Sequence, residues 1–255
     1  MMEQLLSRFN ELNLEPTGEF EVSGFQAVDG AIAAYISRMF DKARVNTKSF
    51  ENASYIRFIG SPAANRVVLG KFDDIVDFLK SLRRSDAWKA KTEKPKNPQV
   101  LPVINVSRSF DTAFMGIEHK RDTPGPLELE VVSDGDDKPY STIGTTNASL
   151  TYSITILAAE KETLSLLINT IGASFRFAGH RSLSAPIKLA LVETALDATF
   201  TDSRDIAFND ISAPIGEERI FAAQAVLTVS ADVKMAMAVN PRKIRHEVVT
   251  AVKED

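Results

Sequence analysis

Few residues in this sequence combine the types and spacing that catalysis or metal binding requires. The histidines His119, His180 and His246 are far apart in the chain. None belongs to an HExxH-type spacing, in which two imidazoles one helical turn apart share a metal ion. We therefore expect them on the surface or in loops. The absence of cysteine excludes disulfides, thiol catalysis and thiolate metal sites, and it suits a reducing compartment.

The acidic residues that could form a site have simpler explanations. Residues 134–137 (Asp-Gly-Asp-Asp) share a composition with calcium loops, but their glycine is second, whereas an EF-hand needs glycine sixth and glutamate twelfth. We predict a hairpin turn there instead. Glu128 and Glu130 could act as an acid and a base from one strand face. Their alternation with Leu127 and Leu129 explains them as the solvent side of a strand.

Nucleotide and nucleic-acid sites also have little support. The sequence contains no GxSxG, GxxxxGK[ST] or GxGxxG motif. Residues 83–98 place Arg83, Arg84 and further lysines around Trp88, a mixture that can bind single-stranded nucleic acid. Intervening acids and prolines favour an exposed connection or a protein contact, and the net charge of -4 argues against a protein that wraps nucleic acid. A second basic cluster, with the same interpretations, consists of Arg242, Lys243 and Arg245.

The first half of the chain contains several segments with clear periodicity. Apolar residues repeat at helical spacing from Asp29, an N-cap residue type, to Ala43 and predict a helix. Residues 54–60 (SYIRFIG) predict a strand, and residues 72–82 an amphipathic helix. Extended segments are predicted at 101–110 and 126–132, the second leading into the acidic turn of a hairpin.

The most regular part of the chain is residues 147–237. Strict alternation at 150–156 predicts a strand, and a helix follows from Glu160 to a stop at Gly172. A further strand is predicted at 187–191. The last strand, 218–235, exceeds the usual length of about 3 to 10 residues. We expect part of it to project beyond a compact sheet or to pair with another chain.

Together these elements predict an α+β fold, with a mostly antiparallel or mixed sheet, long strands, and two or three helices packed on one face. Residues 28–240 are expected to form a single domain, within which 83–98 is an exposed basic connection. Residues 1–27 are expected to be an N-terminal arm or capping segment, and 241–255 a C-terminal arm. No apolar run is long enough for a membrane helix, and the N-terminus lacks a cleavage-like site, so we expect a soluble, unsecreted protein.

The order of elements over more than half the chain resembles the tail sheath stabiliser, or tail-completion, proteins of T4-like contractile-tailed bacteriophages, a tail terminator-like neck family. The segments that carry the resemblance are LPVINV at 101–106, the strand and helix at 150–171, the strand at 187–198, and the long strand at 218–235. In that family the final strand ends near a proline, which Pro241 matches. The long strand departs from the family in its small residues, Ala222, Ala223 and Ala225, where bulkier side chains are expected.

The resemblance implies a structural virion protein without catalytic residues, metal or cofactor. It would form a hexameric ring that caps the contractile tail sheath and tail tube and joins the tail to the head-side connector in the neck. Double-stranded DNA would pass through the ring without specific binding. Assembly would take place in the host cytoplasm, away from any membrane. The alternatives are a tail tube terminator or other neck ring protein, an enzyme with a cryptic site, and a cytoplasmic ligand-binding module.

If the chain is a ring subunit, we expect the long strand or the C-terminal arm to cross a subunit boundary. An unpaired strand edge can join chains through backbone hydrogen bonds, with little demand on side chains. Basic clusters can add contacts to a neighbouring subunit or an acidic partner. The predicted interface residues are Phe221, Ala223, Ala225, Leu227, Val229, Arg83, Arg84, Trp88, Arg242, Lys243 and Arg245.

Overall fold

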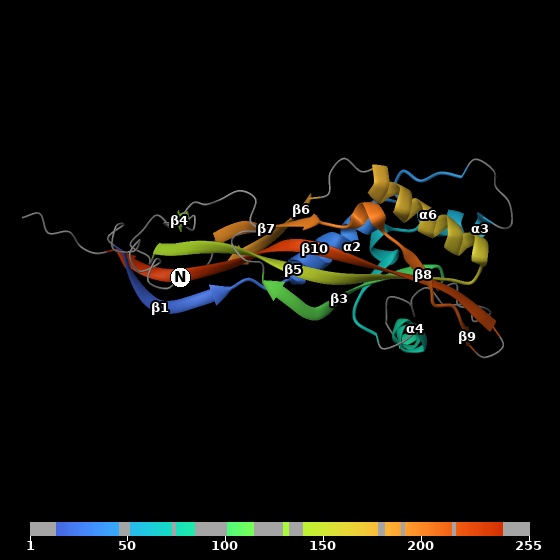
Figure 1. Ribbon diagram of the computed structural model, residues 1–255, viewed down its shortest axis with the longest axis horizontal. Helices are drawn as coiled ribbons and strands as arrows, with labels where there is room; N and C mark the ends of the chain where they lie inside the picture. Colours follow the sequence, from blue (N-terminus) through green and yellow to red (C-terminus); the bar gives the residue numbers. More distant parts are fainter. Residues whose placement is uncertain are drawn as a thin grey trace, which may run out of the picture.

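The protein is an elongated α+β molecule, with helices gathered at one end and a ribbon of long strands extending from the other (Figure 1). The computed structural model describes residues 14–45, 52–72, 75–84, 101–114, 130–132, 140–177, 182–189, 192–215 and 218–241. The helices are α2 (Gln26–Arg38), α3 (Ala53–Ile59), α4 (Ile75–Arg84) and α6 (Lys161–Phe177), with 3-10 turns at Ala63–Asn65 and Ser203–Asp205.

The strands form one mixed sheet with the central order β2-β3-β5-β10-β7-β6. The strands are β1 (Leu14–Val22), β2 (Val67–Leu69), β3 (Val103–Phe114), β4 (Glu130–Val132), β5 (Tyr140–Ala158), β6 (Ser182–Leu189), β7 (Val192–Phe200), β8 (Phe208–Asp210), β9 (Ala213–Ile215) and β10 (Glu218–Pro241). Only β2 and β3 run parallel among the pairings described. The predicted α+β class and mixed sheet are therefore confirmed.

Strands β5 and β10 are the spine of the sheet. Their register is unbroken from the pair Phe221 and Ala158 to the pair Val239 and Tyr140. The alternation predicted at 150–156 is confirmed, because the apolar residues of this segment are buried and the polar ones partly exposed. The predicted hairpin is confirmed by the antiparallel pairing of β4 with the start of β5. Its acidic turn, 134–137, lies outside the described residues.

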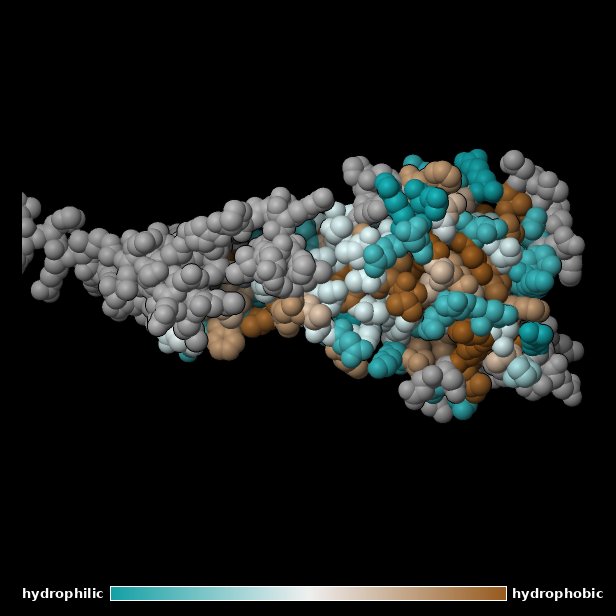
Figure 2. Space-filling view, viewed as in Figure 1, coloured by the Kyte–Doolittle hydropathy of each residue, from teal (hydrophilic) through white to brown (hydrophobic). Residues whose placement is uncertain are grey.

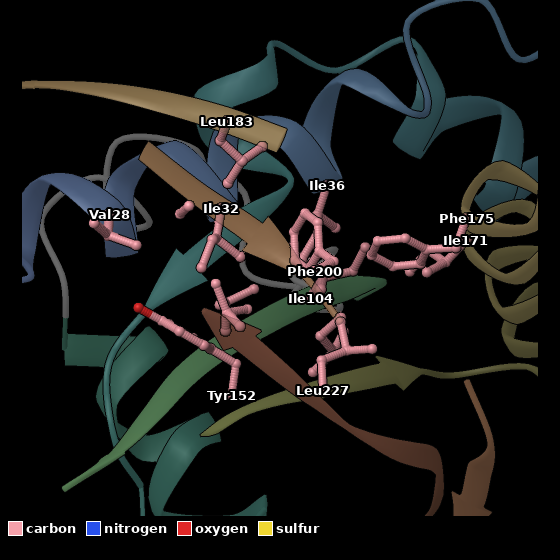
Figure 3. Packing of buried hydrophobic residues seen from close by; sticks show 14 of the residues in the cluster. Val28, Ile32, Ile36, Ile104, Tyr152, Ile171, Phe175, Leu183, Phe200 and Leu227 are labelled. Carbon is pink, nitrogen blue, oxygen red and sulfur yellow. The ribbon is translucent and has the colours of Figure 1, made fainter. Parts of the chain in front are cut away.

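Helices α2, α3 and α6 cover one face of the sheet and build the main core with it (Figure 3). Ile32 and Ile36 of α2 and Ile171 of α6 are completely buried in this cluster. Burying such a side chain contributes about 1.5–3 kcal/mol. Helix α4 packs on the opposite face, where Phe78 lies in a smaller cluster. The prediction of two or three helices on one face is therefore confirmed for α2, α3 and α6. The fourth helix, α4, lies on the other face.

The segment 54–60 was predicted as a strand, and this prediction was wrong. It forms helix α3. Tyr55 and Phe58, three residues apart, lie on one side of the helix and are both buried. Phe58 packs edge-on against Phe40, with 5.0 Å between ring centroids. Tertiary packing of this side outweighs the strand preference of its aromatic and β-branched residues.

Three predicted boundaries also differ from the structure. Helix α2 begins at Gln26, so Asp29 lies inside the helix and is not its N-cap. Helix α6 continues through Gly172 to Phe177. The segment 187–198 is not one strand, because β6 and β7 pair antiparallel as a hairpin within it.

A polar cluster ties α2 to the sheet. The Asp29 carboxylate accepts hydrogen bonds from the Tyr152 hydroxyl at 2.6 Å and from Arg108 Nε at 3.0 Å. Burial raises the pKa of Tyr152, and the hydrogen bond to Asp29 raises it further, so the phenol remains a donor. The Arg108 guanidinium also lies 5.2 Å from the centre of the Phe25 ring. Position 29 is therefore fixed by its partners on β3 and β5.

Arg66 forms a second buried polar centre beside the C-terminal ends of α2 and α3. Its guanidinium donates to the carbonyls of Ser61, Ser37 and Ile59 at 2.8–3.0 Å. Its Nη1 also contacts the Asp41 carboxylate at 2.6 Å. The Arg66 side chain is 7% exposed, and Asp41 is 47% exposed. One side chain thus donates hydrogen bonds to three carbonyls, of which that of Ser37 also accepts one from the Phe40 N–H at 3.2 Å.

Candidate assembly surfaces

A narrow extension of the sheet projects away from the helices (Figure 1). This projecting ribbon consists of β1, β4, residues 140–147 of β5 and residues 232–241 of β10. Strand β1, within the segment predicted as an N-terminal arm, runs antiparallel to the end of β10. Its register shifts between Pro16 and Phe20, where Gly18 has a φ of 88°, a left-handed conformation that glycine tolerates. The expectation that the long strand projects beyond a compact sheet is confirmed.

The β6–β7 hairpin covers one side of the ribbon. Strand β7 pairs with β10 only as far as Ala231, and the hairpin then crosses the ribbon. Ile143, Leu189 and Ala236 form a small cluster in which each is 2% exposed. Lys234 Nζ donates to the Thr194 hydroxyl at 2.7 Å. These contacts hold the hairpin on the side of the ribbon to which the even-numbered residues of β10 point.

Asp232 bridges the point where β7 separates from β10. Its Oδ2 accepts a hydrogen bond from the backbone N–H of Asp197 at 3.2 Å, and its Oδ1 accepts one from Asn147 Nδ2 at 2.7 Å. Burial raises the pKa of Asp232, and the nearby Asp197 carboxylate also raises it, against hydrogen bonds and Lys234 that lower it.

This arrangement predicts a specific dependence on pH. A carboxyl whose pKa is raised on folding favours the folded state most below its unfolded pKa, and this advantage is lost as pH rises through the folded pKa. Replacing Asp197 with Asn should lower the pKa of Asp232, measured by NMR titration of its carboxyl carbon. Unfolding experiments should also show that D197N gains stability over wild type as pH rises above about 4, the ordinary pKa of an aspartate in the unfolded chain. An unchanged Asp232 titration would contradict the assigned repulsion.

The other side of the ribbon carries an exposed apolar strip, formed by Phe20, Val22, Met235 and Met237. Phe20 is 67% and Val22 50% exposed, and the methionines opposite them are partly buried. Figure 2 shows tan and brown atoms along β1 at this place. Helix α2 begins only at Gln26 and leaves the strip uncovered. Contiguous apolar surface of this kind commonly marks a protein contact.

Acidic side chains occupy the side of β1 opposite the apolar strip. Glu19 and Glu21 are exposed and alternate with Phe20 and Val22 along β1. The alternation of charged and apolar residues in Glu-Phe-Glu-Val predicts a strand with one charged side and one apolar side. The sequence-based interpretation missed it because the segment is short and lies beside a proline and a glycine.

A groove lies between α2, α6 and the edge strand β6. Its volume is about 570 Å³, and its lining includes Tyr35, Arg38, Met39, Ser174 and Leu183. Arg38 is exposed, while Tyr35 packs on Phe200 with 5.2 Å between ring centroids. Phe177 follows Ser174 by three residues on α6 and is 87% exposed. Among the strands that are described, β6 pairs only with β7, so its outer edge is open.

A third surface is the polar part of β3, β5 and β10 on the α4 side of the sheet, between α4 and the β6–β7 hairpin, which we call the hydroxyl face. Figure 2 shows pale atoms over these strands. The side chains are partly exposed, and Val226 among them is 56% exposed. The residues of the hydroxyl face are Ser107, Thr151, Ser153, Thr155, Gln224, Thr228 and Ser230.

Four of the predicted interface residues on the long strand belong instead to the core of the chain. Ala223, Ala225, Leu227 and Val229 are at most 3% exposed. The physical reason is that β10 is an interior strand, with β5 along one edge and β1, β7, β8 and β9 along the other. Their side chains pack under the helices, and a prediction of subunit contacts through them was wrong. Phe221 is partly exposed, and the Arg219 guanidinium lies 5.7 Å from its ring centre.

The described part of the structure does not test the remaining predicted contact residues. The backbones of Arg83 and Arg84 belong to α4. The described residues do not include the predicted contact residues Trp88, Arg242, Lys243 and Arg245. They also do not include the histidines His119, His180 and His246.

Within the described ranges, no group of three or more histidine, aspartate or glutamate side chains is placed to hold a metal ion. No helix in that part of the chain is long and apolar enough to cross a membrane. No protein-family model matches the sequence, and no curated protein matches it.

Proposed function

We propose that this protein is a structural subunit of a phage tail neck, which forms a ring that caps the contractile tail sheath and tail tube. The observation that carries the proposal is the projecting ribbon, on which Phe20 and Val22 are exposed and belong to none of the buried clusters described above. A chain gains little from holding apolar side chains out in water unless another surface covers them. We propose the family because the order of elements over 101–241 resembles that of the tail sheath stabiliser proteins.

The proposed ring is a hexamer of this chain, with the tail sheath, the tail tube or its terminator, and the head-side connector as its neighbours. Its proposed place is the neck of the virion. Double-stranded DNA would pass through the opening. The hydroxyl face is suited to line such a passage, because its side chains are uncharged and would release few counterions from a duplex.

A mass measurement tests the proposal. Light scattering of the purified full-length protein should give a closed oligomer of defined mass, and addition of sheath subunits should give a larger complex. A monomer at all concentrations, with no complex on adding sheath or tube subunits, would contradict the ring. The second candidate, a tail tube terminator, predicts co-purification with tube subunits in preference to sheath subunits.

A further inference from the structure

The apolar strip and the groove lie at different borders of the molecule. In Figure 1, β1 runs along the lower border and β6 along the upper border. One copy can therefore place its strip in the groove of a neighbour. Its own groove then stays open to the strip of a second neighbour. Contacts between unlike surfaces of identical subunits are heterologous, and they close into rings when the rotation between neighbours permits.

The two surfaces are complementary in chemistry. Strand β1 presents Phe20 and Val22 on one side of its edge and the exposed Glu19 and Glu21 on the other side. The groove presents the apolar parts of Tyr35, Met39 and Leu183 with the exposed cation Arg38. Apolar anchors with an oppositely charged rim are the arrangement that gives both affinity and orientation at protein interfaces.

The size of the groove also suits side chains from a neighbour. Its volume of about 570 Å³ lies within the range of roughly 300–1,000 Å³ typical of ligand-sized sites. The exposed Phe177 stands beside it on α6 and would be covered by a docked strand. Anchoring aromatic residues near the centre of a contact contribute most of the binding energy in protein interfaces.

The edges themselves are poorly suited to backbone pairing. Strand β1 contains Pro16 and a bulge around Gly18, and β6 contains Pro186 near its middle. Proline removes a hydrogen-bond donor, and bulges turn an edge away from a second strand. The contact must therefore rely on side chains.

We propose that the edge strand β1 of one copy's projecting ribbon docks edge-on in the groove of a second copy, so that Phe20 and Val22 contact the groove on one side of β1 and Glu19 faces Arg38 on the other. This proposal rests on the proposed ring and names the contact that would build it.

A charge-swap experiment tests the contact. Sedimentation velocity of the full-length protein is measured for wild type, Glu19→Lys and Arg38→Glu over a range of concentrations. Each variant should weaken assembly roughly tenfold or more, since like charges then face each other. An equimolar mixture of the two variants should restore assembly, because every contact between alternating copies then joins opposite charges: the swapped pair at one contact and the native pair of Glu19 and Arg38 at the next.

Matched controls separate this contact from general effects. Asp202→Lys makes the same charge change at an exposed position near Ser203–Asp205 and should leave assembly unchanged. The double replacement of Phe20 and Val22 by Ala should weaken assembly at least as much as Glu19→Lys, without lowering the melting temperature, because both side chains are exposed.

The outcomes distinguish the two proposals. If the wild-type protein remains monomeric, both the proposed ring and the proposed contact are wrong. If wild type assembles and both charge variants assemble equally well, the docking is wrong and the ring stands. If Arg38→Glu instead abolishes binding of sheath subunits and leaves the ring intact, the groove accepts a different protein and the docking is also wrong. Weakening by each variant with rescue in the mixture supports it.

Discussion

Replacing Arg66 with Met should lower the free energy of unfolding by about 2–6 kcal/mol, since each of two carbonyls left unpaired in the interior costs about 1–3 kcal/mol. The guanidinium serves the carbonyls of Ser61, Ser37 and Ile59 in a place where water has little access. Methionine fills similar space but donates no hydrogen bonds, so the Ser61 and Ile59 carbonyls lose this donor, and the Ser37 carbonyl keeps only the Phe40 N–H. Urea unfolding followed by circular dichroism measures the loss.

Two further variants show which contacts of Arg66 matter. Asp41→Asn should cost less than about 1 kcal/mol, because Asp41 is 47% exposed and its ion pair is screened by solvent. Arg66→Lys should recover only part of the loss, since an ammonium group cannot reach three separated carbonyls with a planar fork. A loss in Asp41→Asn as large as that in Arg66→Met would show that the ion pair, and not the carbonyl contacts, is the source of stability.

Replacing Phe175 with Ala should lower the free energy of unfolding by about 3–5 kcal/mol. The Phe175 ring is fully buried and lies 5.9 Å from the Tyr35 ring and 5.2 Å from the Phe200 ring, centroid to centroid. Figure 3 shows Phe175 and Phe200 facing each other in the core. Truncation leaves a cavity where α2, α6 and β7 meet, and each remaining ring loses a partner. Thermal unfolding should show a drop on the order of 10 °C.

Phe177→Ala is the matched control for this prediction. It makes the same truncation two residues further along α6, at a side chain that is 87% exposed. Its effect on unfolding should stay within about 0.5 kcal/mol. Equal losses in the two variants would mean that the aromatic cluster does not carry the packing assigned to it.

The strands that sequence patterns predict best are those with one buried and one polar side. At 150–156 the alternation is strict, and one residue of slip would put every apolar side chain into solvent. Helix α3 shows the limit of such reasoning. Tyr55 and Phe58 suit either structure locally, and their burial under neighbouring elements decides for the helix.

The small residues of the long strand have a clear place in the structure. The sequence shows Ala223 and Ala225 but not which elements cross them. Ala223 belongs to the cluster that includes Leu167 and Ile171 of α6, and Ala225, two residues further along the same side of the strand, is completely buried. An interior strand beneath helices needs small side chains where the layers approach closely.

The candidate surfaces were less predictable than the fold. Arg38 and Phe20 are nearly 20 residues apart and look ordinary in the sequence. Only the chain's path puts Arg38 at a groove beside β6 and Phe20 on an uncovered ribbon. Buried Arg66 is equally hidden, since its partners are mostly carbonyl groups, which every residue possesses.

The continuous ladder between β5 and β10 has a mechanical consequence. Every one of the 19 residues of β5 faces a partner on β10, so the two strands form a beam about 60 Å long that reaches from the helices to the tip of the ribbon. A pull along this beam loads its hydrogen bonds in shear and together, whereas peeling would load them one at a time. The ribbon is therefore built to transmit tension to the helical end without stretching.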